Sequence, residues 1–377
     1  MQRRIAATVS LIVLSSIAAT QSVLAVPGLS SSDSVKKIVN TIKLTAHTNS
    51  NDIHTLEQQL RHRPSEAGEA LVDLLDTSDP QVKLKAAQLL ERLSSNPDYS
   101  VSISSLNTII GILKAADDIN IKSSLLMTLG NIGPRSPQVK ATIVQTIKES
   151  REVPDKRRAI EALARLSREE LPELHRQSTE VLIEVLNKDD APSLRAAAAT
   201  ALSQYHSDPE IAVPALTEAL KDNYLKVRVQ AVQALGNYQG EGKSAVSALL
   251  TMLESESDPN IKTSLIYTLR NIGRDNQEVA NAFMKLAEDS PQSRTVFNYL
   301  ADFGPLMAPM IPRLTEMLKS PDRELRRNAA RTLGAMGSAA KDAVPALTKA
   351  QEDSDRTVRS YIEQALRNIQ GASQGSG

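Results

Sequence analysis

The sequence predicts an all-α protein, an α-solenoid or superhelix of about nine helix-turn-helix repeats with an N-terminal helical cap. Three observations predict this fold: one helical segment recurs along the chain, its apolar residues have helical spacing, and the composition favours helices. With 41% hydrophobic residues among 377, the chain can bury a large core. Aromatic residues make up only 3%, so aliphatic side chains suited to close helix contacts supply the packing.

The recurring segment is clearest around a central leucine. Residues Leu325–Gly337 read LRRNAARTLGAMG, and the same pattern returns as VRVQAVQALGNYQ from Val227 and as IKSSLLMTLGNIG from Ile121. Aligned copies place the central leucine at Leu90, Leu129, Leu163, Leu202, Leu235, Leu269, Leu300, Leu333 and Leu366. Successive leucines are 31 to 39 residues apart, which leaves room for two helices and two turns in each repeat.

The residues around each central leucine predict an amphipathic helix, here called the second helix of the repeat. Apolar residues stand four positions before and three positions after the leucine, as Ala329 and Met336 do around Leu333. This i, i+4, i+7 spacing places an apolar stripe on one helix face. The stripe must be covered by another part of the chain.

A column of acidic residues predicts where the second helices begin. It stands eleven positions before the central leucine and comprises Asp79, Asp118, Glu152, Asp258, Asp289, Asp322 and Asp355. A carboxylate there accepts hydrogen bonds from the free backbone N–H groups of the first turn. Pro80 and Pro259, which follow two of these residues, suit the first helical position.

A first helix precedes each second helix, as in AVPALTEAL from Ala212 and MIPRLTEML from Met310. Pro214, Pro312 and Pro345 recur at one place in it, which indicates an early-turn or kinked position. Each repeat is then a helical hairpin too small to bury its own apolar stripe. Neighbouring repeats must therefore stack on one another.

These motifs resemble the HEAT-repeat family, and most closely its short subgroup first noted in phycobilisome lyases (PBS-lyase-like repeats). The resemblance rests on VPAL in the first helix, Asp at the turn and VRxxAxxALGxxG in the second helix, and it covers most of the chain from Ala67 to Gln370. It implies that a basic residue after the valine-like position bonds the Asp of an adjacent turn and forms a ladder. That column comprises Lys83, Lys122, Lys156, Arg195, Arg228, Lys262, Arg326 and Arg359, and only Ser293 departs from it.

The first 25 residues predict a secretory signal peptide. MQRR gives a basic start, an apolar stretch follows from Ile5 to Ala19, and Val23 and Ala25 precede the expected cleavage site. The alternative is an uncleaved membrane anchor, but serine and threonine dilute this stretch below what a spanning helix carries. We expect an exported protein, periplasmic or secreted, with no stable membrane insertion after cleavage. The predicted segments are the signal peptide 1–25, a linker and helical cap 26–66, the solenoid 67–370 and a flexible tail 371–377.

No motif predicts catalysis, a cofactor or a metal site. The numbers of basic and acidic residues are equal at 44, so nucleic acid is not an expected partner. Iron-binding HEAT enzymes use His-Glu pairs, and none of His47, His54, His62, His175 and His206 is followed by Glu. The glycines after the second helices, Gly133, Gly273, Gly304 and Gly337, are expected to end them in the left-handed conformation.

The second helices of stacked hairpins usually line the concave side, so their exposed residues are the candidate partner-binding residues. Asn and Gln recur two positions from the central leucine, at Asn131, Gln233, Asn237, Asn271, Asn298 and Asn368. Such a row can bond the N–H and C=O groups of an extended peptide. The alternative is that these amides satisfy carbonyl groups of the last helical turn or of the next repeat. Arg294, Arg327, Arg331 and Arg367 form a basic cluster that could receive an acidic partner.

We therefore predict a non-catalytic scaffold or adaptor that binds a protein or peptide along the concave face. The resemblance leaves two alternatives open. One is a bilin-lyase-like or metal-dependent HEAT-repeat enzyme. The other is an envelope spacer without a ligand.

Overall fold

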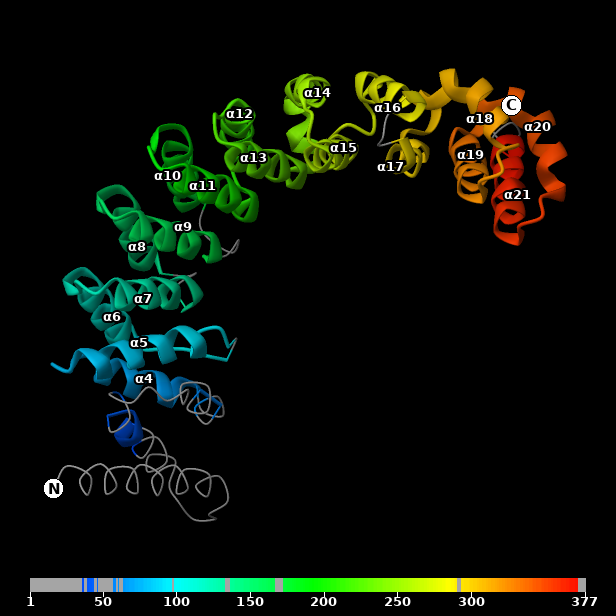
Figure 1. The fold of residues 1–377 in the computed structure, drawn as a ribbon. Helices are drawn as coiled ribbons and strands as arrows, with labels where there is room; N and C mark the ends of the chain where they lie inside the picture. Colours follow the sequence, from blue (N-terminus) through cyan, green and yellow to red (C-terminus); the bar gives the residue numbers. More distant parts are fainter. Residues whose placement is uncertain are drawn as a thin grey trace, which may run out of the picture. The chain divides into compact units, whose positions relative to one another are not determined.

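The computed structural model of the chain describes residues 36, 39–43, 46, 57–58, 60, 64–96, 98–132, 136–166, 172–289 and 293–371. All regular elements within these residues are helices, and none is a strand (Figure 1). The predicted all-α solenoid is confirmed. The chain divides into two compact units, Met1–Val185 and Leu186–Gly377.

Helical hairpins build the first unit, with first and second helices in separate layers. First helices α4, α6 and α8 contact one another along the stack, as do second helices α5, α7 and α9. Their bounds are Pro64–Leu75 for α4, Pro80–Leu93 for α5, Ile103–Ala115 for α6, Ile119–Ile132 for α7, Pro137–Glu149 for α8 and Val153–Arg165 for α9, with α10 at Pro172–Lys188.

The second unit repeats this arrangement with more 3-10 helix. The second helices are α11 (Pro192–Tyr205), α13 (Leu225–Asn237), α15 (Pro259–Ile272), α17 (Ser293–Phe297), α19 (Arg323–Ala335) and α21 (Arg356–Gly371). The remaining helices are α12 (Pro209–Ala219), η2 (Gln239–Ala245), α14 (Val246–Ser255), α16 (Gln277–Asp289), η3 (Leu300–Met310), α18 (Ile311–Met317), η4 (Gly337–Ala343), α20 (Val344–Lys349) and η5 (Ala350–Glu352). Neighbours α11, α13 and α15 pack in sequence, and so do α19 and α21.

The core lies between the two layers and between successive repeats. The central leucines are fully buried in the first eight repeats, and Leu366 in the last is 8% exposed. Burying a leucine side chain contributes about 1.5–3 kcal/mol, so this column alone is a large part of the folding free energy. The apolar stripe that the sequence predicts is therefore the core of each repeat.

Glycines directly after three central leucines allow the second helices to approach closely. A Cβ at Gly130 would lie 2.7 Å from the carbonyl oxygen of Ala162, and one at Gly236 would lie 2.9 Å from Oγ1 of Thr268. At Gly334 it would lie 2.9 Å from Cα of Ala365. In each case the contact is with the second helix of the next repeat. Glycine is needed here for packing between repeats.

The predicted caps are found in most repeats. Asp79 and Asp258 each accept two backbone N–H bonds at the helix start, and Asp322 accepts one. Asp118 and Asp355 accept two in the same way, whereas Glu152 stands at the cap position without a side-chain bond. Each such cap contributes about 0.5–2 kcal/mol.

The recurrent prolines have the predicted places. Pro312 and Pro345 fall in the first turn of α18 and α20, each after a 3-10 segment. Pro214 lies inside α12. A proline ring is tolerated in the first turn because that turn has no N–H bond to lose.

The seventh repeat departs from the prediction. Its second helix, α17, is five residues long, and Leu300 begins the 3-10 segment η3. Gly304 inside η3 has φ 49° and ψ −126°, and Pro305 and Pro309 lack N–H groups, so a regular α-helix cannot continue here. The expectation that Asp289 caps this helix was wrong, because Asp289 is the last residue of α16.

The glycine expectation also needs correction. Gly337, with φ 53°, has the positive φ that the prediction requires, but Gly273 ends α15 at φ −126° and ψ 26°. Gly304 has a positive φ outside the left-handed helical region. Gly133 lies outside the described residues. The left-handed conformation is instead adopted by His206 at the end of α11.

The last second helix, α21, presents a polar surface where earlier repeats present an apolar one. Three positions before the central leucine, the first eight repeats have a buried apolar residue: Ala87, Leu126, Ile160, Ala199, Val232, Ile266, Phe297 and Ala330. In the last repeat this position is Glu363, whose side chain is 58% exposed. Arg367 occupies the place of Gly334 and is 64% exposed. Solenoids require such polar outer faces at their ends.

At the other end, described residues ahead of α4 contribute to the core. Ile42 and Leu60 are buried, and buried Glu57 accepts a hydrogen bond from Nη1 of Arg92 at 3.1 Å. The predicted signal peptide 1–25 and most of the linker and cap 26–66 lie outside the described residues. So does the tail from residue 372 onward.

Candidate interaction surface

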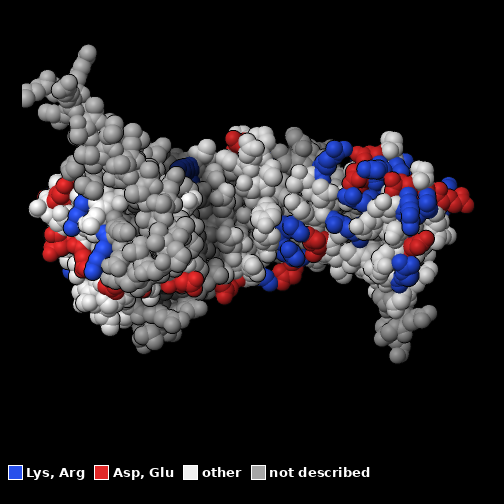
Figure 2. Space-filling model, turned by 90° about the horizontal axis from the view of Figure 1, so that it is seen from below, with Lys and Arg blue, Asp and Glu red and all other residues white. Residues whose placement is uncertain are grey.

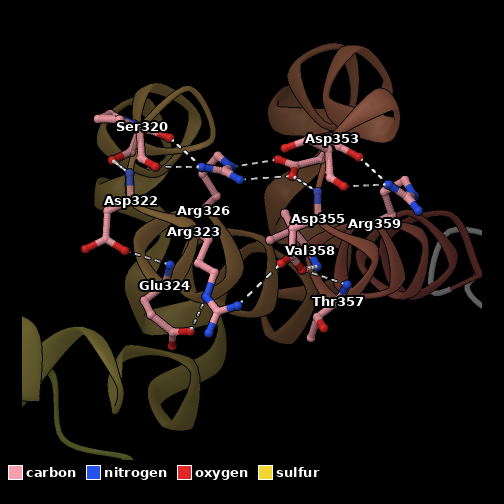
Figure 3. A network of polar contacts seen from close by, with 12 residues as sticks. Ser320, Asp322, Arg323, Glu324, Arg326, Asp353, Asp355, Thr357, Val358 and Arg359 are labelled. Carbon is pink, nitrogen blue, oxygen red and sulfur yellow. Dashed lines mark hydrogen bonds and ion pairs between the residues drawn. The ribbon is translucent and has the colours of Figure 1, made fainter.

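An arginine ladder joins successive repeats at the turn between first and second helices (Figure 3). Arg326 of α19 donates from Nε and Nη2 to the two carboxylate oxygens of Asp353, at 2.7 and 3.0 Å. Its Nη1 donates to the carbonyl oxygens of Ser320 and Pro321, at 2.8 and 3.1 Å. One guanidinium therefore ties its own turn to the turn of the next repeat.

The same contacts recur earlier in the second unit. Arg195 donates to both carboxylate oxygens of Asp222 at 2.7 and 3.0 Å. Nη1 of Arg228 and Nη1 of Arg359 each donate to two backbone carbonyl oxygens, those of the residues six and five positions earlier in the chain. Arg195 and Arg326 form the same two bonds. Only the planar fork of arginine can bond a carboxylate and two carbonyls at once.

The ladder that the resemblance implies is present, but its acid differs from the expected one. Asp222 and Asp353 stand two residues before the cap position, and each Oδ1 accepts the backbone N–H two residues on, at 2.8 Å. The sequence carries a signal for this column thirteen positions before seven of the nine central leucines. Thr77, Ser150, Asp189, Asp222, Glu256, Ser320 and Asp353 all accept this N–H bond.

Lysine members of the basic column behave differently. Lys122 donates to Asp155 at 3.2 Å, and Asp155 lies inside the next second helix rather than in its turn. The side chains of Lys83 and Lys262 form no hydrogen bond or ion pair with the described residues. A lysine has a single ammonium group and cannot reproduce the fork. The ladder is therefore an arginine feature.

The ladder also sets the charge state of its acids. The Arg195 hydrogen bond is the largest influence on Asp222 and holds the pKa of that carboxyl below its ordinary value, against the opposing effect of burial. Arg326 lowers the pKa of Asp353 in the same way. Both carboxylates are thus ionised at neutral pH, and their contribution to this surface is structural.

Several amides of the predicted row form hydrogen bonds to side chains of neighbouring repeats. Asn131 donates to Oγ of Ser94 at 2.9 Å and accepts from Nη1 of Arg165 at 2.9 Å, so it connects three repeats. Asn237 donates to Oγ of Ser203 at 2.6 Å. These contacts support the alternative in which the amides satisfy polar groups of neighbouring repeats.

The remaining amides divide between internal contacts and exposure. Asn368 donates to the carbonyl oxygen of Gly334 at 3.2 Å, and Oδ1 of Asn298 accepts from Asn328 at 2.8 Å. Gln233 is exposed and accepts from Gln230 of its own helix at 3.2 Å. Asn271 is half-buried and has no hydrogen bond to the described residues. Their role in partner binding stays a prediction.

The four predicted arginines lie on the second helices of the last three repeats. Arg294 pairs with Asp322 at 3.0 Å and keeps 76% of its side chain exposed. Arg327 pairs with Glu324 in its own helix, and Arg331 donates to the carbonyl oxygen of Asn298. Arg367 lies 3.9 Å from Glu363. The structure therefore brings these four side chains onto one group of neighbouring helices.

A fifth arginine marks the irregular seventh repeat. Nε of Arg270 donates to Asp302 at 2.5 Å, and its guanidinium lies 4.4 Å from the ring centre of Tyr299. Both partners belong to the segment in which the second helix is broken. Next to this pair along α15, Tyr267 has 52% of its surface exposed. The repeat pattern places Tyr267 two positions before its central leucine, among the exposed residues, but it did not indicate Arg270, because the break in α17 was not expected.

The two described histidines, His175 and His206, do not belong to a metal site. Within the described residues no group of three or more His, Cys, Asp or Glu side chains could hold a metal ion. His206 stacks on Tyr238 with ring centres 4.7 Å apart. His47, His54 and His62 lie outside the described residues. A search of the described helices found none long and apolar enough to cross a membrane.

Comparisons with known proteins agree with this architecture. HEAT repeats match residues 141–225, 213–298 and 294–367, which together exceed half of the chain. No curated protein matches the sequence. A crystal structure of an engineered protein, a target of the Northeast Structural Genomics Consortium, is similar with a TM-score of 0.52 and 22% identity, over 88% of this chain and 98% of that one. That likeness concerns the fold alone. With its stacked hairpins and this family match, the chain belongs to the HEAT-repeat family.

Proposed function

We propose that this protein is a non-catalytic scaffold that binds a protein or peptide along the exposed face of its second helices, the face predicted to be concave. HEAT repeats are commonly protein-interaction scaffolds. The observation that carries the proposal is that second helices pack side by side within each unit, and that exposed polar residues such as Gln233 and Gln364 recur on them at the same repeat position. Binding is then spread over many modest contacts.

The internal ladders support such a role because they fix the spacing between repeats. The Arg326–Asp353 contacts hold one turn against the next, and the amide of Asn131 joins three second helices. A surface whose repeats keep a constant spacing loses little conformational entropy when a long ligand binds to it.

Site-directed crosslinking in cells tests the proposal. A photoreactive residue at Gln233 or Gln364 on the second helices should crosslink to one or a few defined proteins, identified by mass spectrometry. The same residue at exposed Gln145 on first helix α8 is the matched control. Equal labelling at all three positions, or labelling of none, would favour the ligandless envelope spacer.

An enzymatic role of the bilin-lyase-like or metal-dependent kind is the second candidate. It follows from the likeness of VPAL and VRxxAxxALGxxG to the PBS-lyase-like repeat subgroup. Absorption spectra and metal analysis of the protein purified from its native cells test it. A stoichiometric bound chromophore or metal would overturn the non-catalytic proposal.

We further propose that the chain is exported after cleavage behind Ala25, to the periplasm or the medium. The basic start MQRR and the apolar stretch from Ile5 to Ala19 support this proposal. N-terminal sequencing of the cellular protein should begin at Val26. A protein that retains Met1 and sediments with membranes would indicate an uncleaved anchor instead.

A further inference from the structure

The second helices of the last three repeats carry an unusual charge pattern. Together α17, α19 and α21 contain eight arginines, two glutamates and no lysine or aspartate. Two of the arginines, Arg326 and Arg359, belong to the ladder. The other six form what is here called the arginine face: Arg294, Arg323, Arg327, Arg331, Arg356 and Arg367.

Helical spacing places these residues on corresponding faces of their helices. At about 100° per residue, the five arginines on α19 and α21 fall within a sector of roughly 80° when the two helices are aligned on their central leucines. Arg294 of α17 reaches Asp322 at the start of α19. Since α19 packs against both α21 and α17, the six residues belong to three neighbouring helices. Figure 2 shows Lys and Arg side chains gathered there at the C-terminal end, with carboxylates among them.

Three guanidinium groups of this face are well exposed and available to a ligand. Arg294, Arg323 and Arg367 have side chains 76%, 69% and 64% exposed. The ion pairs of Arg323 with Glu324 and Asp355 are long, at 3.5 and 3.7 Å. Exposed pairs of this kind contribute about 0–1 kcal/mol, so a carboxylate from a partner can replace them at small cost.

Two arginines of this face have N–H donors that the described residues do not use. Exposed Arg356 forms no ion pair with the described residues. Nε of Arg331 is buried and has no hydrogen-bond acceptor, although its terminal nitrogen donates to Asn298. A partner carboxylate at the surface would offer acceptors to such donors, and arginine binds a carboxylate through two parallel bonds.

We propose that the arginine face binds an extended peptide segment rich in Asp and Glu. A peptide in the polyproline II conformation, an extended helix with three residues per turn, advances about 3.1 Å per residue, so its side chains three residues apart point the same way. Neighbouring helices lie roughly 10 Å apart. Carboxylates three residues apart therefore meet arginines of successive repeats. The bidentate Arg326–Asp353 pair is the same chemistry within this chain.

A peptide fits this face better than a nucleic acid does. Glu324 and Glu363 lie among the arginines and would repel a continuous row of phosphates. Individual carboxylates, spaced along a peptide, can avoid them. The inference rests on the proposed scaffold function and adds the chemistry of the partner.

Binding of a fluorescent 12-residue peptide with Glu at every third position tests the inference. The full-length protein should bind it at least tenfold more tightly than the same peptide with Gln in place of Glu. The triple variant Arg294→Ala, Arg323→Ala, Arg367→Ala should lose at least tenfold in affinity. Its control is Arg313→Ala, Lys341→Ala, Lys349→Ala, which removes the same charge from the first-helix side of these repeats and should change affinity less than threefold.

Two results would overturn it: equal losses in both triple variants, or a single-stranded oligonucleotide that binds as tightly as the Glu peptide. The triple Arg→Lys variant at the same positions guards against misfolding, and it should retain part of the affinity with an unchanged circular dichroism spectrum. Crosslinks to a partner from Gln233, without any binding of the acidic peptide, would refute this inference and leave the scaffold function standing.

Discussion

Gly334 lies so close to Ala365 of the next repeat that a Cβ added to it would be 2.9 Å from Cα and 3.0 Å from Cβ of that alanine. The contact joins α19 to α21 through backbone atoms, which cannot rotate away. At this point the two second helices are in direct backbone contact, and there is no room for a side chain at position 334.

Gly334→Ala should therefore lower the free energy of unfolding by about 1–3 kcal/mol, the usual cost of overpacking. Gly111→Ala is the matched control, because Gly111 lies in the middle of α6 with no atom within 4 Å of an added Cβ. That substitution should raise stability by about 0.4–1 kcal/mol, since alanine is the better helix former. Urea unfolding measures both changes in unfolding free energy. Changes of the same sign in the two variants would contradict the close packing of Gly334.

The arginine ladder predicts that lysine cannot replace arginine at its positions. Arg326→Lys keeps the charge but loses the bidentate bond to Asp353 and both bonds to the carbonyl groups. We expect a loss of about 1–3 kcal/mol in unfolding free energy. Arg323→Lys, at a side chain 69% exposed, should change stability by less than about 0.5 kcal/mol. A double-mutant cycle with Asp353→Asn isolates the pair, and a coupling energy near zero would argue against the ladder.

The lowered pKa values of Asp222 and Asp353 predict an acid-sensitive contribution to stability. A carboxyl whose pKa is lower in the folded state stabilises the protein fully above its ordinary value, 3.8 for Asp. That contribution is lost as the pH falls below 3.8 through the folded-state pKa. Urea unfolding at pH 5, 4 and 3 should show a shallower acid loss for Asp353→Asn than for the unchanged protein. Parallel curves would mean that this carboxyl is not held by Arg326.

The polar end face of α21, formed by Glu363 and Arg367, is expected to prevent another apolar helix face from packing on it. Replacing Glu363 with Leu and Arg367 with Gly recreates the apolar and small residues that stand at these positions elsewhere, as Ala330 and Gly334 do. The double variant should self-associate in light scattering at micromolar concentration, because an uncovered apolar face seeks a partner. Gln364→Leu adds a similar apolar area outside this face and should leave the protein in its original oligomeric state.

Much of the repeat could be read from the sequence because its signals are local. The central leucines, the apolar stripe and the Asp caps depend on helical spacing and on the first-turn N–H groups, and Leu333, Ala329 and Asp322 are buried or bonded as predicted. The irregular seventh repeat was missed because Leu300 fits the periodic pattern. Gly304, Pro305 and Pro309 nevertheless prevent a regular helix.

By itself the sequence determined that this chain is a stack of helical hairpins, since an apolar stripe repeated along nine hairpins can be buried only by neighbours. Only the tertiary structure decided what each polar side chain contacts. For Asn131 the sequence left two roles open, binding a ligand or bonding a neighbouring repeat, and in the structure it bonds Ser94 and Arg165 in the repeats on either side. Periodicity gives the helix face of a residue, whereas its hydrogen-bond partner depends on the register between helices more than thirty residues apart in sequence, which local spacing does not encode.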